Sequence, residues 1–163
     1  MTANMSDDAR AVHPLMRIPV PWVFALVYLA GAAVQRLLPI ATPKVLLLPI
    51  RLAGFALMAG GVALAAWCLL LFRSEKTTTT PGELSNRLVT WGPYRFTRNP
   101  MYVSLTLCYL GEAGILLQIW PLLLLPIVLA YLHRTVIPVE EQRLSLAFGA
   151  AYTAYADRVR RWI

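Results

Sequence analysis

The sequence predicts an all-α integral membrane protein with four transmembrane helices, a cytosolic loop and a C-terminal amphipathic helix. Hydrophobic residues make up 58% of the 163-residue chain and charged residues only 14%, well below the roughly 25% of a soluble domain. The apolar residues form long unbroken blocks, and basic residues collect between them. This pattern excludes a soluble enzyme, a disordered chain and a secreted disulfide scaffold, and it indicates one domain over residues 1–163.

The predicted spans cover about residues 20–38, 52–72, 101–117 and 119–137. The second block contains no charge, and at 1.5 Å per residue its length is about 31 Å, one hydrocarbon thickness. Small residues at Gly54, Gly60 and Gly61 would let a neighbouring helix approach this span closely. The short connection at Gln118 predicts a tight hairpin between the last two spans, and Pro126 predicts a kink in the fourth.

The distribution of charge sets the expected orientation. Of the 15 Lys and Arg residues, 12 lie before the first span, between the second and third, and after the fourth; the other 3 lie in the first loop. The positive-inside rule then places both termini in the cytoplasm, in an inner or plasma membrane. The polar segments 73–100 and 138–163 face the cytosol in this arrangement. The formal charge of +7 is explained by the membrane, so no nucleic acid partner is expected.

The segment 138–163 is predicted to form one amphipathic helix, packed on the spans or lying in the headgroup layer. Its apolar and aromatic residues recur at spacings of three and four, which is one face of a helix: Leu144, Phe148, Tyr152, Tyr155, Val159 and Trp162.

Glu112 falls inside the third block, where a charge costs roughly 2.5 to 3.5 kcal/mol on insertion scales. Three interpretations are open: a neutral carboxyl, a pair with Gln118 or Arg36, or a position near the outer interface. We favour the last, which gives Glu112 a structural role. Cys68 and Cys108 lie within apolar blocks and are expected to be free thiols used in packing.

Two polar clusters on the cytosolic side contain the residues suited to chemistry. The first, GPYRFTRNPMY at 92–102, is a proline-bounded turn that bears cations and phenols directly before the third span. The second is the pair Glu140 and Glu141, which follows Pro138. Both have structural explanations as well, since Arg and Tyr are common at membrane interfaces and carboxylates favour the first turn of a helix. No metal site is expected.

These two clusters and their order resemble the membrane methyltransferase family that contains isoprenylcysteine carboxyl methyltransferase and the phospholipid N-methyltransferases. The resemblance rests on GPYRFTRNPMY at 92–102, on EEQRLSLAFGAAYTAY at 140–155, and on the order span, loop, hairpin, acidic pair and amphipathic tail. It covers roughly the last 90 residues. Members of this family use S-adenosylmethionine, and a lipophilic acceptor reaches them from the bilayer. The resemblance implies the same cofactor and the same kind of acceptor here.

The resemblance also implies which residues bind the cofactor, because they match the motifs of the family: Tyr94, Arg98, Asn99, Pro100, Tyr102, Glu140 and Glu141. One position departs from the pattern. The eukaryotic carboxyl methyltransferases have Arg-His-Pro where this chain has Arg98, Asn99 and Pro100, so a role of an imidazole does not carry over. Asparagine keeps a donor and an acceptor but does not titrate.

The chemistry of S-adenosylmethionine agrees with these residue types. The molecule carries a positive sulfonium, a positive ammonium and one carboxylate, so its site needs groups of both signs. Glu140 or Glu141 suits the ammonium, Arg98 and Asn99 suit the carboxylate, and a tyrosine face suits the sulfonium. The adenine needs an apolar slot, for which the candidates by position are Leu88 and Val89.

The sequence does not single out a catalytic residue. A carboxylate or thiolate acceptor needs no base, whereas an amine must first lose a proton. His133, with Arg134 beside it, and the two glutamates are the nearby candidates for that task. His133 and Arg134 are equally well explained as residues of the membrane interface.

The function we predict is S-adenosylmethionine-dependent methyl transfer to a lipophilic acceptor, an isoprenylcysteine-like carboxylate or another hydrophobic small molecule, at the cytosolic membrane face. The alternative within the enzymes is a phospholipid amine N-methyltransferase. A small four-span exporter and a non-catalytic membrane subunit are alternatives of other classes, although the long polar tail is not needed in an exporter. The acceptor atom, the substrate tunnel and the oligomeric state stay open at this point.

Overall fold

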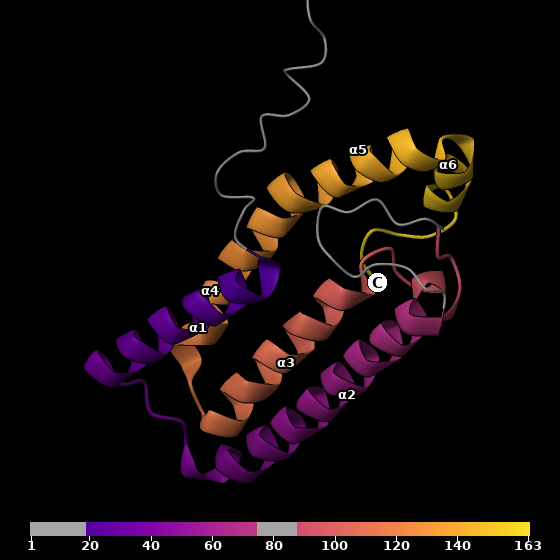
Figure 1. Ribbon diagram of the computed structural model, residues 1–163. Coiled ribbons are helices and arrows are strands. Elements are labelled where there is room, and N and C mark those ends of the chain that lie inside the picture. Colours follow the sequence, from indigo (N-terminus) through magenta and orange to yellow (C-terminus); the bar gives the residue numbers. More distant parts are fainter. Residues whose placement is uncertain (1–18, 75–87) are drawn as a thin grey trace, which may run out of the picture.

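The computed structural model describes residues 19–74 and 88–163, which are helical and contain no strand (Figure 1). Residues 1–18 and 75–87, for which the sequence predicts a cytosolic position, lie outside the described residues. The main helices are α1 (Val20–Leu37), α2 (Leu47–Ser74), α3 (Pro100–Leu116), α4 (Ile119–Tyr131), α5 (Ile137–Phe148) and α6 (Ala150–Ala156). Two short 3₁₀ turns, η3 (Lys44–Leu46) and η4 (Gly92–Arg95), precede α2 and α3.

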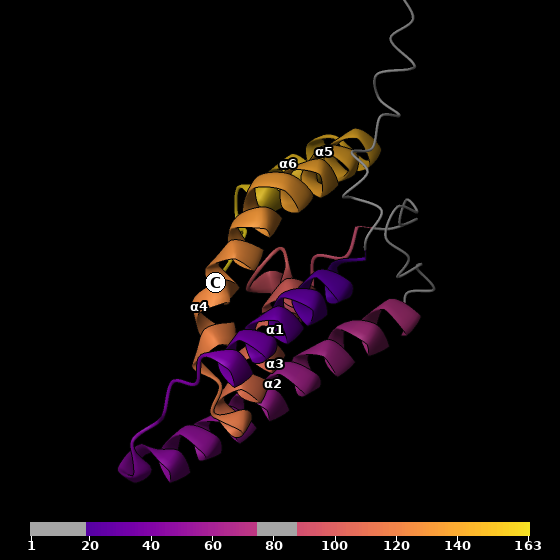
Figure 2. The same cartoon turned by 90° about the vertical axis from the view of Figure 1, so that its left-hand side faces the viewer.

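The helices form two antiparallel pairs. Helix α2 packs along α3 and α1 packs along α4, with fewer contacts between the pairs (Figure 1). We call the end where α2 finishes and α3 begins the loop end, and the opposite end, with the α3–α4 turn, the hairpin end. Helices α5 and α6 extend beyond the bundle at the loop end (Figure 2). The residues of the candidate site lie at that end.

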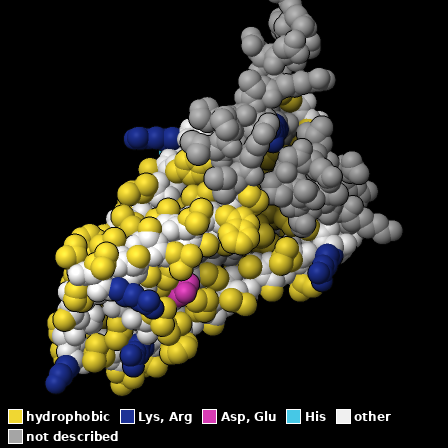
Figure 3. All heavy atoms as spheres, turned by 60° about the vertical axis from the view of Figure 1, so that its left-hand side comes forward, with side chains coloured by type: hydrophobic (Ala, Val, Ile, Leu, Met, Phe, Trp, Pro, Cys, Tyr) yellow, Lys and Arg dark blue, Asp and Glu magenta, His cyan; other side chains and the backbone are white. Residues whose placement is uncertain are grey.

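Three helical stretches within the described residues are long and apolar enough to cross a membrane: Val20–Leu37, Lys44–Ser74 and Ile119–Phe148. Large apolar side chains point outward from them; Leu29 is 63% exposed and Phe55 is 58% exposed. The surface in Figure 3 is accordingly apolar over most of its described area. The chain is thus an integral membrane protein. Helix α3 has 17 residues, about 26 Å, so a fourth span remains a prediction.

Helices α2 and α3 approach so closely that there is no room for a side chain at several glycine positions of their contact. A Cβ added to Gly61 would lie 2.7 Å from the Cys108 sulfur and 2.9 Å from the Ser104 carbonyl oxygen. Gly54 and Gly111 are equally restricted, by backbone atoms of the opposite helix. This confirms the role expected of Gly54 and Gly61. It does not apply to Gly60, which has no such neighbour within 4 Å.

The hydrophobic core lies between α1, α3 and α4. Its central contacts are aromatic: the Tyr109 ring meets Phe24 and Tyr28 edge to face, with centroids 6.0 and 5.0 Å away. The Tyr109 hydroxyl donates to the Pro121 carbonyl at 2.9 Å, which links α3 to the start of α4. Fully buried Leu132 and Ile137 extend the core toward the loop end.

The predicted hairpin between the last two spans is present. Helix α3 ends with Leu117 in the left-handed conformation, at φ 56°, and the Gln118 amide donates to the Ala113 carbonyl at 2.9 Å. The side-chain oxygen of Gln35 in α1 accepts from the amides of Ile119 and Trp120, both at 3.3 Å. A side chain from α1 therefore satisfies the first amides of α4.

Helices α4 and α5 form one continuous rod with an irregular turn inside it. The helix passes through Pro126 and stays helical to Tyr131, after which residues 132–136 form a π-helical turn. Pro138 explains the position of this turn, because a proline cannot donate to the carbonyl four residues earlier and its ring crowds that carbonyl. His133 and Arg134 lie in the π turn.

The prediction of a single helix over 138–163 is wrong. The helix ends at Phe148, reverses at Gly149 with φ 51°, resumes as α6 and ends at Ala156. The periodic pattern ran through Gly149, a residue that readily adopts positive φ and so allows the chain to turn. Residues 157–163, called the tail below, follow without helical structure.

Glu112 lies one turn before the end of α3, on the side of the hairpin end, and is exposed. An acidic side chain with basic ones near it interrupts the apolar surface of Figure 3. No ion pair of Glu112 exists within the described part of the chain, so a pair with Arg36 is not formed there. Cys68 and Cys108 are free thiols, as expected.

The close contact of α2 and α3 leads to a test with a matched control. Gly61→Ala should lower the melting temperature, because the added methyl group meets atoms that cannot move apart freely; overpacking of this kind costs about 1 to 3 kcal/mol. Gly60→Ala, one residue earlier on the open side of α2, should leave the temperature unchanged or raise it. Thermal unfolding in detergent measures both, and equal effects of the two substitutions would contradict the packing.

Candidate functional site

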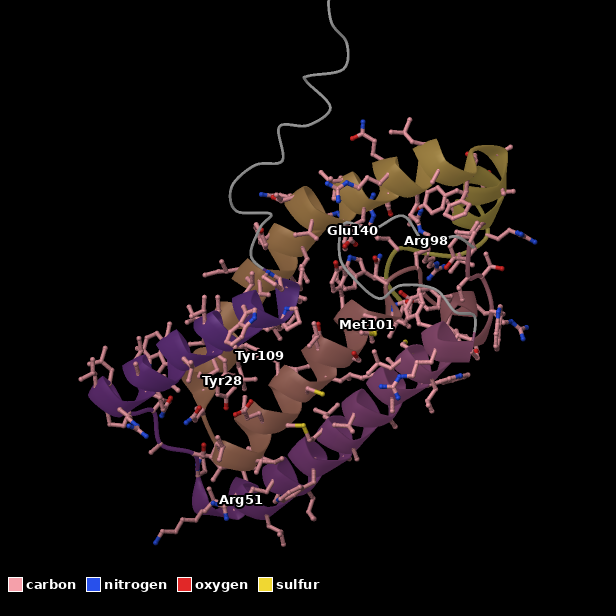
Figure 4. All side chains as sticks on the ribbon, in the orientation of Figure 1. Tyr28, Arg51, Arg98, Met101, Tyr109 and Glu140 are labelled. Atoms are coloured by element: carbon pink, nitrogen blue, oxygen red, sulfur yellow. The ribbon has the colours of Figure 1, made fainter. Side chains whose placement is uncertain are left out.

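The two sequence motifs meet at the loop end, although they lie 38 residues or more apart in the chain. The Tyr102 hydroxyl donates to Oε1 of Glu140 at 2.6 Å, and Nη2 of Arg98 lies 3.3 Å from Oε1 of Glu141. Figure 4 shows Arg98 and Glu140 near each other below α5, although one comes from the loop before α3 and the other from α5. The proline-bounded turn and the acidic pair therefore form a single site.

The turn over 92–99 owes its shape to its own residues. Gly92 has φ +62°. A Cβ at this position would lie 3.3 Å from Cδ2 of Leu71, so the turn packs against the end of α2. The Asn99 carbonyl accepts from the amides of Tyr102 and Val103, which starts α3. Pro100 occupies the first helical position, where no amide donor is needed, and is fully buried. Its role is to fix the turn.

Glu140 lies among phenols. Tyr102 is the residue that donates to it within the described part of the chain, and it donates to Oε1, so Oε2 keeps both of its lone pairs. Tyr94 and Tyr131 are close enough to interact electrostatically with this group of residues. Burial raises the pKa of Tyr94, so its phenol stays neutral at physiological pH. A carboxylate with free acceptor capacity beside neutral aromatic rings suits a small cation.

Glu141 is bound by two arginines. Arg161 donates from Nε to Oε1 at 3.0 Å and from Nη2 to Oε2, a bidentate arrangement, and Arg98 adds its contact to Oε1. The hydrogen bond from Arg161 to the carboxylate raises the pKa of that guanidinium. We call these three residues the ion cluster. It carries a formal charge of +1, and its side chains are only 16% to 29% exposed.

Arg98 keeps donor capacity for a ligand. Its Nε atom is buried and has no hydrogen-bond partner within the described residues. The guanidinium also lies beside the Tyr152 hydroxyl of α6, a buried side chain whose pKa is raised by burial. A buried N–H without an acceptor costs free energy, and a ligand carboxylate would satisfy it.

The tail runs back along the turn and hydrogen-bonds to it. The Arg161 carbonyl accepts from the Asn99 side-chain amide at 2.8 Å and from the Thr97 hydroxyl at 3.1 Å. The Arg160 carbonyl accepts from the Arg98 amide at 2.9 Å. Asn99, which the resemblance assigned to the cofactor, thus uses one of its two side-chain N–H donors on the tail.

The site is also fixed from α6 and from the π turn after α4. The Tyr155 hydroxyl donates to the Tyr94 carbonyl at 2.8 Å, and burial raises the pKa of Tyr155 to about 12. The Trp162 indole donates to Nδ1 of His133 at 3.2 Å, so His133 anchors the end of the tail. His133 and Arg134 are exposed, and neither contacts the glutamates within the described structure. The position of His133 suits anchoring better than proton transfer.

The two residues proposed for the adenine slot precede the turn. Val89 is buried and Leu88 is partly buried. An open hollow lies at the end of α2 beside this region, and it is lined by Trp67, Leu70, Leu71, Ser74 and Trp91. No group of three His, Cys, Asp or Glu residues with the geometry of a metal site occurs in the described ranges.

Sequence reasoning missed Arg161, Thr97 and the anchoring role of Trp162. Arg161 lies 20 residues beyond Glu141, and no local spacing relates the two, so their contact depends on the reversal at Gly149. Arg161 is one of three arginines at the end of a helix that was expected to be continuous, and nothing in the sequence distinguished it as the partner of Glu141.

The comparisons with known proteins agree with the geometry. The family model described as phospholipid methyltransferase matches residues 50–151, which is more than half of the chain and includes the turn motif at 92–102 and the acidic pair Glu140 and Glu141. No curated protein and no solved structure matches the chain significantly. On the strength of the family match, the chain belongs to the phospholipid methyltransferase family.

Proposed function

We propose that this protein transfers a methyl group from S-adenosylmethionine to a lipophilic acceptor at the cytosolic face of its membrane. The observation that carries the proposal is the meeting of Arg98 and Tyr102 with Glu140 and Glu141 at one end of an apolar helical bundle. This arrangement presents both signs of charge beside aromatic rings, next to the lipid-facing surface. Membership of the methyltransferase family supports it.

The cofactor groups fit the donors and acceptors that the site leaves open. Within the described residues no donor occupies Oε2 of Glu140, which suits the ammonium, and the N–H at Nε of Arg98 has no acceptor, which suits the carboxylate. The faces of Tyr94 and Tyr102 suit the sulfonium. Leu88 and Val89 would border the adenine, since they lead into the turn that carries Tyr94. Asn99 and Pro100 contribute by holding the turn in shape.

When bound, S-adenosylmethionine supplies a methyl group already activated by its positive sulfur. The residues of the chain then have to orient the reactants and exclude water, which can contribute up to roughly 7 to 11 kcal/mol. An acceptor embedded among the apolar helices would bring its polar end to the loop end. A carboxylate or thiolate reacts there without a base. An amine must lose a proton first, for which Glu140 is better placed than His133.

The same proposal includes the membrane topology. With both termini in the cytoplasm, α3 serves as a fourth span and the loop end lies at the cytosolic surface. The acceptor is then a lipid or a lipophilic small molecule such as an isoprenylcysteine-like carboxylate. A phospholipid amine is the second candidate acceptor, and the description of the matched family favours it.

Binding of the cofactor can be tested without knowing the acceptor. In detergent, S-adenosylmethionine or S-adenosylhomocysteine should raise the melting temperature, since saturation at 100 times Kd stabilises by about 2.7 kcal/mol. Glu140→Gln should reduce this shift strongly, because the ammonium loses its counter-charge. Asp157→Asn removes a negative charge from an exposed residue at the end of α6 and serves as the matched control. A small exporter would show no shift, and that result would end the proposal.

Methyl transfer itself can be measured with labelled S-adenosylmethionine. We expect label in the organic phase when the protein is incubated with total membrane lipid or with prenyl-cysteine analogues. Base-labile label indicates a methyl ester and so a carboxylate acceptor, whereas base-stable label in phospholipid indicates an amine. A protein that binds the cofactor but labels neither class would be a non-catalytic subunit. That outcome would remove the enzymatic part of the proposal.

A further inference from the structure

The two neighbouring glutamates have different surroundings, although the family resemblance treats them as a pair. A carboxylate offers about four lone pairs to donors. Arg161 uses two of them on Glu141, and Arg98 adds an ion pair with the same carboxylate at 3.3 Å, whereas Tyr102 uses one on Glu140. The charge of Glu141 is thus already compensated by the protein itself. Within the described residues, Glu140 keeps most of its capacity for a ligand.

The arginine that donates twice to Glu141 belongs to the tail. Residues 160 and 161 accept three hydrogen bonds through their carbonyl groups, from the amide of Arg98 and from the side chains of Thr97 and Asn99. The Arg161 side chain then reaches Glu141 on α5, so one residue ties the turn to the helix. Glu141 lies inside the segment that matches the family, whereas Arg161 lies beyond its end at residue 151.

We propose that Arg161 is a positioning residue of the cofactor site, and that Glu141 serves as its counter-ion and not as a ligand of the cofactor. Arg161 fixes the orientation of the Glu141 carboxylate on α5, and this carboxylate in turn holds Arg98 in place. Glu140 is then the acidic residue that contacts the cofactor. This inference rests on the proposed cofactor site, but the contact that it depends on can be tested without any cofactor.

Three observations support a positioning role over direct binding. The bidentate pair fixes the Glu141 carboxylate in one orientation. Removing Arg161 would leave the partly buried Glu141 carboxylate with only the longer contact to Arg98, so the pair is costly to break. An ammonium that bound Glu141 would have to displace the Arg161 guanidinium. The backbone of Arg161 is itself held in place, because its carbonyl accepts hydrogen bonds from Asn99 and Thr97.

A charge exchange separates the two roles. Glu141→Arg alone puts three arginines together, and Arg161→Glu alone puts two glutamates together; each should weaken S-adenosylhomocysteine binding by about tenfold or more. The double variant, Glu141→Arg with Arg161→Glu, keeps one carboxylate and two guanidinium groups in the ion cluster and restores an opposite-charge pair between α5 and the tail. It should regain most of the binding. If Glu141 contacts the ammonium directly, an arginine at 141 cannot replace it, the double variant stays weak, and the proposal fails.

A second readout does not involve the cofactor. Amide hydrogen exchange of residues 158–163 should be faster in both single variants and should return toward the wild-type rate in the double variant. Unchanged exchange in the single variants would overturn the role of Arg161 in holding the tail. Arg160→Ala is the matched control, since it removes a neighbouring exposed positive charge but keeps the carbonyl that binds the turn. It should change neither binding nor exchange.

The two readouts also distinguish this inference from the proposed function. A wild-type protein that does not bind S-adenosylhomocysteine contradicts the proposed function, while the exchange rates still decide whether Arg161 and Glu141 hold the tail. Conversely, a protein that binds the cofactor normally but shows no rescue in the double variant keeps its function and loses the positioning role of Arg161.

Discussion

The contact between Glu141 and its two arginines joins three parts of the chain that the membrane helices leave separate. Arg98 comes from the turn before α3, Glu141 from α5 and Arg161 from the tail. The helix pairs of the bundle fix the positions of α3 and α4, but α5 extends beyond the bundle and touches little of it. The ion cluster, together with the hydrogen bond from Tyr102 to Glu140, therefore connects the acidic pair to the turn.

The close glycine contact of α2 and α3 is the second feature on which the position of the site residues depends. Because Gly61 and Gly111 bring the two backbones together, the end of α2 and the start of α3 lie side by side. The chain therefore has to turn in the last residues before α3. Gly92 and Pro93 form that turn, and Gly92 packs against the side chains of Leu71 and Trp67 of α2. Packing inside the membrane thus determines where Arg98 and Tyr102 point.

Hydrophobic blocks predicted the positions of the long helices within a few residues, because burial in lipid requires unbroken apolar stretches. The motifs predicted that Arg98 and Tyr102 would meet Glu140 and Glu141, and the structure confirms their proximity. The break at Gly149 was missed, because one glycine does not disturb an apolar periodicity. The contacts that depend on that reversal were missed as well. The main one is the contact of Arg161 with Glu141, a residue distant in sequence and adjacent only in space.

The charges of the site fit the proposed reaction as well as the cofactor. Arg98, Arg161, Glu140 and Glu141 sum to zero, and S-adenosylmethionine carries a net charge of +1, whereas its demethylated product is neutral. The ammonium and carboxylate are the same in both molecules, so the difference lies at the sulfur. Tyrosine faces favour a sulfonium over a neutral thioether, since the attraction is electrostatic. A carboxylate nearby, such as Glu140, adds to the same preference. In the proposed complex, loss of the methyl group therefore removes an attraction on the side of Glu140, and the ion cluster on the other side is left unchanged.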